Sequence, residues 1–152
     1  MRMEISSFCK DVPIFIDEKC CTKCVSIHHT PVKIEVHISD VSDFEFLYLL
    51  IIDEENYRIL KKEQNIVVEF REFPSLIAEL FDHCSQSWNE ENLKCCLSNG
   101  ILQILQPGKV KALVQIELNF KVASESALRK HLVTHIKNFK VLLQVTNNAE
   151  NP

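Results

Sequence analysis

The sequence FEFLYLLIIDEENYRILKKEQNIVVEFREFPSLIAELF, residues 44–81, contains the pattern that decides the fold. Its beginning, residues 44–52, is an almost continuous apolar run of strand length, which predicts a central strand buried on both faces. Asp53 and two glutamates follow this run, and lysines come later. An aspartate N-cap with acids in the first turn and bases in the last turn is typical of a short helix. Asn65 ends the helical pattern.

The second half of this stretch predicts one more strand and one more helix. Residues 66–70 form a short apolar run that indicates a strand. Pro74 stands near the predicted first turn of the next helix, where proline is tolerated. Apolar residues at spacings of one, three and four then predict a buried stripe made of Leu76, Ile77, Leu80 and Phe81.

Strands are also predicted on both sides of this stretch. Upstream, residues 32–39 alternate between apolar and polar side chains, which is typical of a strand with one buried face. Downstream there are three strand candidates, residues 93–97, 101–106 and 110–122. Turn signals separate them, and these are Asn99-Gly100 and Pro107-Gly108.

The C-terminal part predicts a long helix with Ser124 as its N-cap. Five of its positions step by four, three, four and three, the spacing of a coiled-coil seam, and these positions are Leu128, Leu132, His135, Phe139 and Leu142. We therefore expect a globular domain over residues 1–122, the helix over residues 123–146 and a frayed tail over residues 147–152. The fold class is α+β, a mostly antiparallel sheet with two short helices and a long C-terminal helix.

Length and composition exclude several classes of protein. The chain has 152 residues, the length of one ordinary domain, with 46% hydrophobic and 25% charged residues. With a net charge of −4, the chain lacks the excess of basic residues that nucleic-acid binding normally needs. No apolar run approaches the ~18 residues of a membrane helix, and the first residues lack the apolar segment of a signal peptide. We expect a soluble, intracellular protein with neither nucleic acid nor membrane as partner.

Seven cysteines, two pairs of them adjacent in sequence, indicate reduced thiols rather than a disulfide framework. Cys21-x-x-Cys24 has the ligand spacing of a zinc site, and His28 follows closely. A structural zinc site usually draws two ligand pairs from well-separated positions, whereas His28 and His29 would point to opposite faces of a strand, so at most one of them could join. We therefore expect no metal, and Cys21, Cys24 and His28 are weak candidates only.

The sequence contains no arrangement from which catalytic roles can be assigned. Only two glycines occur, which excludes the glycine-rich loops that cradle phosphates. A Gly-x-Ser-x-Gly motif is absent as well. We expect no enzyme, no cofactor and no small-molecule substrate, which leaves assembly as the function. Val110, flanked by Lys109 and Lys111, is either an apolar residue at a loop edge or an inward-facing strand residue.

Four segments of residues 46–84 resemble the N-terminal head domain of the centriolar cartwheel protein, spindle assembly abnormal protein six. They are Phe46-Leu47-Tyr48, Glu54-Glu55, Val67-Val68-Glu69-Phe70 and Phe73-Pro74. The resemblance covers residues 20–85 best, and Cys21-x-x-Cys24 is similar to the family's first hairpin. It implies a small β-barrel or sandwich with a helical insertion, followed by a helix that starts a parallel coiled-coil dimer. DNA end-joining scaffold proteins share this head, but the acidic charge argues against DNA contact.

The family resemblance also implies a function. Coiled-coil dimers of the family meet through their heads and close into a nine-fold ring that templates the centriole or basal body, in the cytoplasm and cytoskeleton. Partners would be further copies of the chain and other centriolar or cytoskeletal proteins. Head-only relatives at flagellar or apical cytoskeletal structures are the alternative, as protein-binding modules. A Cys/His zinc protein or enzyme is the alternative of another class.

In the family, an exposed bulky apolar residue, here called the knob, enters a pocket on the neighbouring head. It is usually the phenylalanine of an Asn-Pro-Phe-Lys turn. The corresponding turn here is Gly108-Lys109-Val110-Lys111, so the resemblance implies Val110 as the knob, with Lys109 and Lys111 beside it. Valine buries less apolar area than phenylalanine. At ~25 cal/mol per Å², its free energy of burial is smaller by about 1 kcal/mol, which implies weaker head association.

Overall fold

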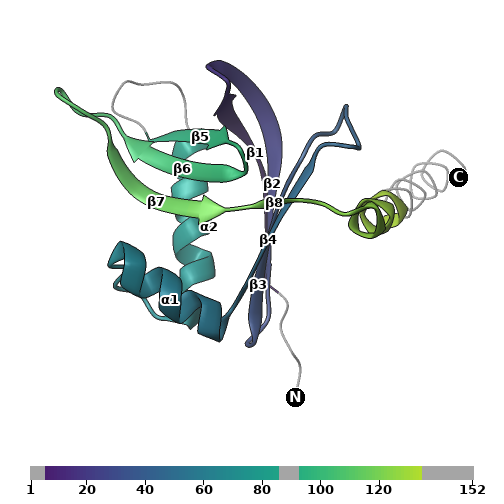
Figure 1. Cartoon of the computed structure of the whole chain (residues 1–152), viewed down its shortest axis with the longest axis horizontal. Helices are drawn as coiled ribbons and strands as arrows, with labels where there is room; N and C mark the ends of the chain where they lie inside the picture. The colour runs from purple at the N-terminus through teal and green to yellow at the C-terminus, as the bar shows by residue number, and fades with distance from the viewer. Residues whose placement is uncertain (1–5, 86–92, 135–152) are drawn as a thin grey trace, which may run out of the picture. The chain divides into compact units, whose positions relative to one another are not determined.

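The computed structural model describes residues 6–85 and 93–134 (Figure 1). Its chain divides into two compact units, residues 1–122 and residues 123–152. In the described part of the first unit, eight strands form one sheet in the order β7-β6-β5-β1-β2-β3-β4-β8. Their bounds are β1 Ser6–Ile16, β2 Lys19–His29, β3 Lys33–Ser39, β4 Leu47–Asp53, β5 Lys94–Ser98, β6 Ile101–Gln106, β7 Leu113–Asn119 and β8 Lys121–Val122.

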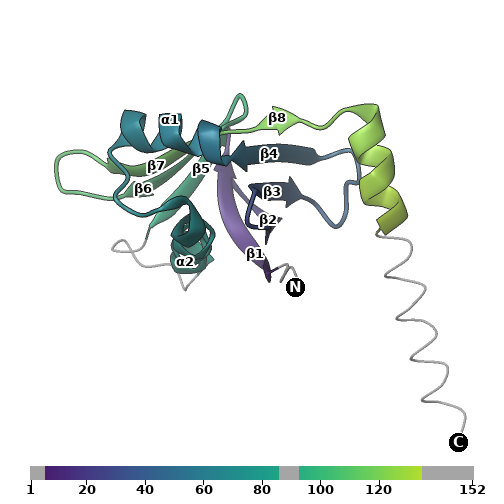
Figure 2. The same ribbon diagram turned by 90° about the horizontal axis from the view of Figure 1, so that it is seen from below.

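Two α-helices lie between β4 and β5 in the sequence, α1 over Glu54–Gln64 and α2 over Phe73–Ser85, with a 3-10 turn at Phe70–Glu72 before α2. In both views they lie on the same side of β1 as β5, β6 and β7 (Figures 1 and 2). All strand pairs are antiparallel except β1 with β5, which are parallel. This mixed sheet with inserted helices confirms the α+β prediction.

The core includes the apolar faces that the sequence predicted in β3 and α2. Ile34, Val36 and Ile38 alternate with polar residues along β3 and are fully buried, as expected for a half-buried strand. In α2, Ile77 and Phe81 are fully buried at helical spacing. Leu76 and Leu80 of the predicted stripe pack at the margin of the same core.

Helix α1 confirms its predicted start and stop. Asp53 has extended backbone, and its Oδ1 accepts a hydrogen bond of 2.7 Å from the Asn56 N–H. Asn65 adopts the left-handed conformation with φ of 54° and closes the helix. Local capping chemistry therefore fixes both ends of α1.

The predicted strand over residues 66–70 is wrong. These residues are irregular and lead into the 3-10 turn, and Val67 is 88% exposed. The run is apolar because Ile66, Val68 and Phe70 pack against the core. Tyr57 of α1 holds it in place, because its hydroxyl donates to the Val68 carbonyl at 2.5 Å and its ring lies 5.6 Å from that of Phe70.

The expectation of a central strand buried on both faces is also wrong. Strand β4 begins only at Leu47, because residues 43–46 form a turn that Asp43 stabilises. β4 pairs with β8 only at Tyr48 and Leu49, so it lies next to the sheet edge. Ile51 is accordingly 55% exposed. Apolar content alone did not show which neighbours the strand would have.

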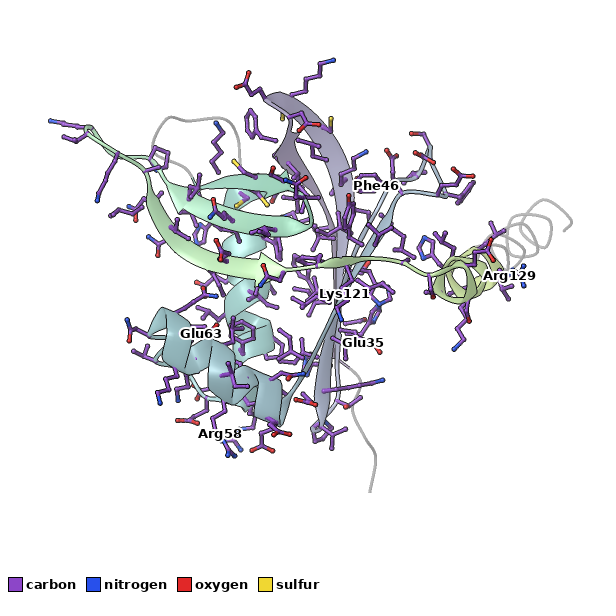
Figure 3. The ribbon with its side chains drawn as sticks, viewed as in Figure 1. Glu35, Phe46, Arg58, Glu63, Lys121 and Arg129 are labelled. Carbon is purple, nitrogen blue, oxygen red and sulfur yellow. The ribbon has the colours of Figure 1, made fainter. Side chains whose placement is uncertain are left out.

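A charged corner precedes β4. The Lys23 ammonium lies 2.6 Å from Oδ2 of Asp40 and 4.1 Å from the ring centre of Phe46, which Figure 3 labels. Hydrogen bonds from Lys23 and Ser42 lower the pKa of Asp40 to about 2. The corner joins β2 to the loop between β3 and β4.

The second unit is described only over residues 123–134, and residues 125–134 are helical. Ser124 is the N-cap, as predicted, because its Oγ accepts a hydrogen bond of 3.2 Å from the Ala127 N–H. Within the described residues, none of the helices has the length and apolar character needed to cross a membrane.

Candidate interaction site

The loop between β6 and β7, residues 107–112, carries the most exposed large apolar side chain described. Val110 is 97% exposed at its tip, so of the two interpretations of this residue the structure supports the loop edge. The predicted strand over residues 110–122 in fact begins at Leu113. Lys109 and Lys111 are exposed on either side of Val110.

The loop is tight at its first turn because of Gly108. A Cβ atom at this position would stand 2.4 Å from the Lys111 carbonyl oxygen, a distance that no side chain tolerates. At the base of the loop, the Gln115 side-chain amide donates to that of Gln106 at 2.8 Å across the two strands. These contacts hold the two lysines and the valine together at the end of a β-hairpin.

Strand β7 carries the exposed apolar surface onward from the loop. Leu113 and Val114 are about half exposed. Farther along the strand, the side chain of Gln64 from α1 pairs with the backbone of Glu117, accepting from its N–H at 2.8 Å and donating to its carbonyl at 2.7 Å. This pairing satisfies the outer edge of β7 at Glu117, so the edge is covered there by a side chain instead of a strand.

A small pocket of about 70 Å³ lies where β1 and β2 meet α2. Its lining is largely apolar and comprises Ser7, Phe8, Ile27, His29, Pro74, Ser75 and Ala78. Phe8 and Ile27 are directly paired across the two strands. Figures 1 and 2 show that the elements forming the pocket lie away from the tip of the β6–β7 hairpin.

An ion pair holds helix α2 against β1 beside this pocket. The Lys10 ammonium contacts the Asp82 carboxylate, and this hydrogen bond lowers the pKa of Asp82. Asp82 follows Ala78 by one helical turn, so the ion pair lies next to the pocket lining. The helix and strand that form the pocket are therefore linked by charge as well as by packing.

Sequence reasoning did not find this pocket. Its lining comes from the β1–β2 hairpin and from α2, which begins more than 40 residues later in the chain. No local pattern distinguishes Phe8 or Ala78 from ordinary core residues. Only a prediction of the tertiary contacts could have found it.

The weak metal candidates do not form a site. Cys21 lies three residues from Cys24 on β2, so the two side chains point to opposite faces of the strand. Cys24 and His28 share a face, and the His28 ring lies 5.7 Å from that of His37. Among residues 6–85 and 93–134, no group of three or more His, Cys, Asp or Glu side chains is arranged to hold a metal ion.

The predicted helix seam lies partly within the described residues. Leu128 and Leu132 are one helical turn apart on the same helix face, and Leu132 is 40% exposed. The three remaining seam positions, His135, Phe139 and Leu142, lie outside the described residues.

Comparison with known proteins gives consistent results at the level of sequence. The family described as "Centriolar protein SAS N-terminal domain" matches residues 5–120. The spindle assembly abnormal protein 6 homolog of Xenopus laevis is 31% identical over 120 residues, 72% of this chain and 18% of that protein. The Danio rerio homolog is 27% identical over 116 residues, 69% of this chain and 18% of that protein. The chain thus spans about a fifth of the length of these relatives.

Solved structures share the fold. An N-terminal fragment of Leishmania SAS-6 that contains part of its coiled-coil domain superposes with a TM-score of 0.80 at 16% identity, covering 96% of this chain and 94% of the fragment. A Drosophila melanogaster Sas-6 fragment, dimerised via the coiled-coil domain, gives 0.80 at 15% identity and covers 96% and 77%. The N-terminal coiled-coil dimer of C. elegans SAS-6 gives 0.60 at 20% identity and covers 91% and 97%.

Proposed function

Because this chain belongs to the family of centriolar SAS N-terminal domains, we propose that it is a structural module that assembles copies of itself through head-to-head contacts. In this proposal, residues 1–122 are the head and residues 123–146 form the start of a coiled-coil stalk. The assembly is the hub of the centriolar or basal-body cartwheel. The activity is mechanical rather than catalytic.

The observation that carries the proposal is the exposed Val110 at the tip of a tight hairpin. An apolar side chain with 97% of its surface in water gains free energy when a partner covers it. Burying a valine contributes about 1.5 kcal/mol, less than burying a phenylalanine. We therefore expect a single head-to-head contact to be weak. The flanking Lys109 and Lys111 keep the free loop soluble.

The pocket between β1, β2 and α2 is the proposed socket for Val110. Its lining offers apolar surface from Phe8, Ile27, Pro74 and Ala78. Its volume of about 70 Å³ offers space for an apolar side chain of the neighbouring head.

Two different surfaces on one head make the proposed contact heterologous. Val110 lies in the β6–β7 loop, whereas residues of β1, β2 and α2 line the pocket, so one copy uses its loop while its neighbour uses its pocket. Such contacts generate rings when the rotation closes and open filaments when it does not. A head with one knob and one socket therefore suffices to build a ring.

The C-terminal helix supplies the second contact of the proposal. Leu128, Leu132 and the later seam positions form an isologous coiled-coil dimer, which pairs two heads. Pairing makes each further head contact multivalent, so two weak interfaces support one stable assembly. Other centriolar and cytoskeletal proteins are the further partners expected for such a hub, and the location is the centriole or basal body.

Sedimentation velocity over a concentration series tests the proposal. The wild-type chain should associate as concentration rises, and Val110→Glu should remove the head-to-head part of that association. The matched control is Val67→Glu, because Val67 is 88% exposed in a different loop. The control should associate like the wild type. A wild-type chain whose association is unchanged by Val110→Glu would contradict the proposal and favour a head that only docks another protein.

A further inference from the structure

Two cysteines on neighbouring strands bring their sulfur atoms into contact. Cys9 lies on β1 and Cys24 on β2, and their Sγ atoms are 3.3 Å apart. The register of the hairpin pairs Cys9 with Ser26 and Asp11 with Cys24, so the two cysteines are diagonal neighbours. Both side chains therefore lie on the same face of the sheet.

The two sulfur atoms lie almost close enough to form a disulfide, although Cys9 and Cys24 are not neighbours in the sequence. An S–S bond is about 2.05 Å long, so the sulfur atoms need to approach by about 1.3 Å. The Ser26 hydroxyl donates to Cys9 Sγ at 3.6 Å and lies 4.0 Å from Cys24 Sγ, beside the pair instead of between its sulfurs. Because diagonal partners on paired strands lie roughly 7–8 Å apart, joining the sulfurs requires a shift of the strand backbone as well as side-chain rotation.

The two thiols differ in their surroundings. Cys9 is exposed, whereas Cys24 is only partly accessible. Burial, followed by the hydrogen bond with Cys9, raises the pKa of Cys24 to about 11. Because the thiolate is the form that reacts with oxidants, the exposed Cys9 is the thiol that an oxidant reaches first, and Cys24 stands in place to react second.

The other five cysteines, which also lie within the described residues, are arranged differently. Cys84 and Cys95 are buried in the core and inaccessible to a water-borne oxidant. Cys20 and Cys21 are consecutive on β2, so their side chains point to opposite faces of the strand. Cys96 neighbours Cys95 on β5 in the same way. Cys9 and Cys24 combine a thiol that solvent reaches with a contact between their sulfur atoms.

We infer that Cys9 and Cys24 are an oxidisable dithiol, a modification site that closes to a disulfide when the protein meets a hydroperoxide. In the first step the Cys9 thiolate attacks hydrogen peroxide, the O–O bond breaks, hydroxide leaves and Cys9 becomes a sulfenic acid. In the second step the Cys24 sulfur attacks the Cys9 sulfur, the S–O bond breaks and water leaves. Two thiols are oxidised and one peroxide is reduced.

The bond would tie the two central strands of the sheet together. Cys9 directly follows Phe8, which pairs with Ile27, and both of these side chains line the pocket beside α2. The crosslink therefore fixes the strand pair that forms one wall of the pocket. An exposed disulfide of this kind is readily reduced again, so the modification is reversible.

Peptide mapping of the full chain after peroxide treatment tests the inference, because tryptic sites isolate each thiol. Cleavage after Arg2, Lys10, Lys19, Lys23 and Lys33 leaves Cys9 as the only cysteine of residues 3–10 and Cys24 as the only cysteine of residues 24–33. After alkylation of the remaining thiols and digestion without reductant, we expect these two peptides to be joined with loss of two hydrogen atoms. Residues 20–23, which contain Cys20 and Cys21, should not be joined to either.

Two serine variants separate the steps. In Cys24→Ser, the Cys9 sulfenic acid has no partner and should accumulate as a dimedone adduct on residues 3–10. In Cys9→Ser, Cys24 should stay reduced at the same peroxide dose. Cys9 linked to a different cysteine or to a second chain, or a dimedone adduct equally abundant in the wild type, would overturn the inference. Circular dichroism of both variants establishes that they are folded.

Discussion

Two regions of this head use the same kind of side chain for opposite purposes. In the core, Phe81 and Ile77 of α2 are fully buried, and their free energy of burial stabilises the fold. At the tip of the β6–β7 hairpin, Val110 is 97% exposed and stabilises nothing within its own chain. Substitutions in the first region should therefore act on folding, and those in the second on association. This separation makes the proposed function testable residue by residue.

The largest effect is expected from Phe81→Ala. Removing a fully buried phenylalanine leaves a cavity and should lower the free energy of unfolding by about 3–5 kcal/mol. Urea denaturation followed by circular dichroism measures this change. A loss below about 1 kcal/mol would show that α2 contributes far less to the core than its burial indicates.

The next effect concerns the link between α1 and the edge of the sheet. Gln64→Ala removes two hydrogen bonds to the backbone of Glu117, each worth roughly 1 kcal/mol, so stability should fall by about 2 kcal/mol. Hydrogen exchange of the Glu117 amide should rise in parallel. Gln103→Ala is the control, since its side-chain amide donates to the Glu117 carboxylate and not to the Glu117 backbone. Equal amide exchange in the two variants would contradict the assigned contact.

A smaller effect, on association, is expected from a substitution at the tip of the β6–β7 loop. Val110→Phe enlarges the apolar tip and should strengthen association by about 1 kcal/mol, or roughly fivefold in Kd. The free energy of unfolding should change by less than about 0.5 kcal/mol, because the side chain has no intramolecular packing to disturb. If Val110→Phe changed the free energy of unfolding but left the association seen by sedimentation unchanged, Val110 would act on folding and not on association.

The smallest effect is a pH dependence at the charged corner. The pKa of Asp40 is lowered in the folded state to about 2 from 3.8. A lowered pKa means that the contact with Lys23 stabilises the fold above pH ~4 and that this contribution is lost as pH falls toward 2. Unfolding of the wild type should therefore be more acid-sensitive over this interval than unfolding of Asp40→Asn. Identical pH profiles would contradict the ion pair.

Local chemistry explains what the sequence predicted correctly. The ends of α1 follow from Asp53 and Asn65, and the β5–β6 turn follows from Asn99-Gly100, whose φ values are 52° and 79°. The β1–β2 turn was not found, because Asp17 and Glu18 adopt positive φ without the usual Asn-Gly signal. Sequence signals were reliable where a turn or cap is made by its own residues.

Non-local contacts explain what the sequence did not predict. The run over residues 66–70 is apolar because it packs against the core beside Tyr57, and no local pattern distinguishes that case from a strand. The pocket requires Phe8, Ile27 and Ala78 to meet from three elements. Val110 lay between these cases, since Pro107-Gly108 predicted a turn before it but whether Val110 itself lies in the loop or in a strand depended on where β7 begins.

In the proposed assembly, the Val110 loop of one head enters the pocket of another head. Mixing two complementary variants tests this contact. Val110→Glu removes the knob but keeps the socket. Ser75→Phe fills the pocket from an exposed position on α2 and keeps the knob. Association through the C-terminal helix is common to both variants and serves as the baseline.

Analytical ultracentrifugation of each variant alone and of the equimolar mixture is the measurement. Neither variant alone should associate above the baseline. The mixture should form complexes in which each head-to-head contact joins one variant to the other. A mixture that stays at the baseline while the wild type associates would contradict a contact between the Val110 loop and this pocket.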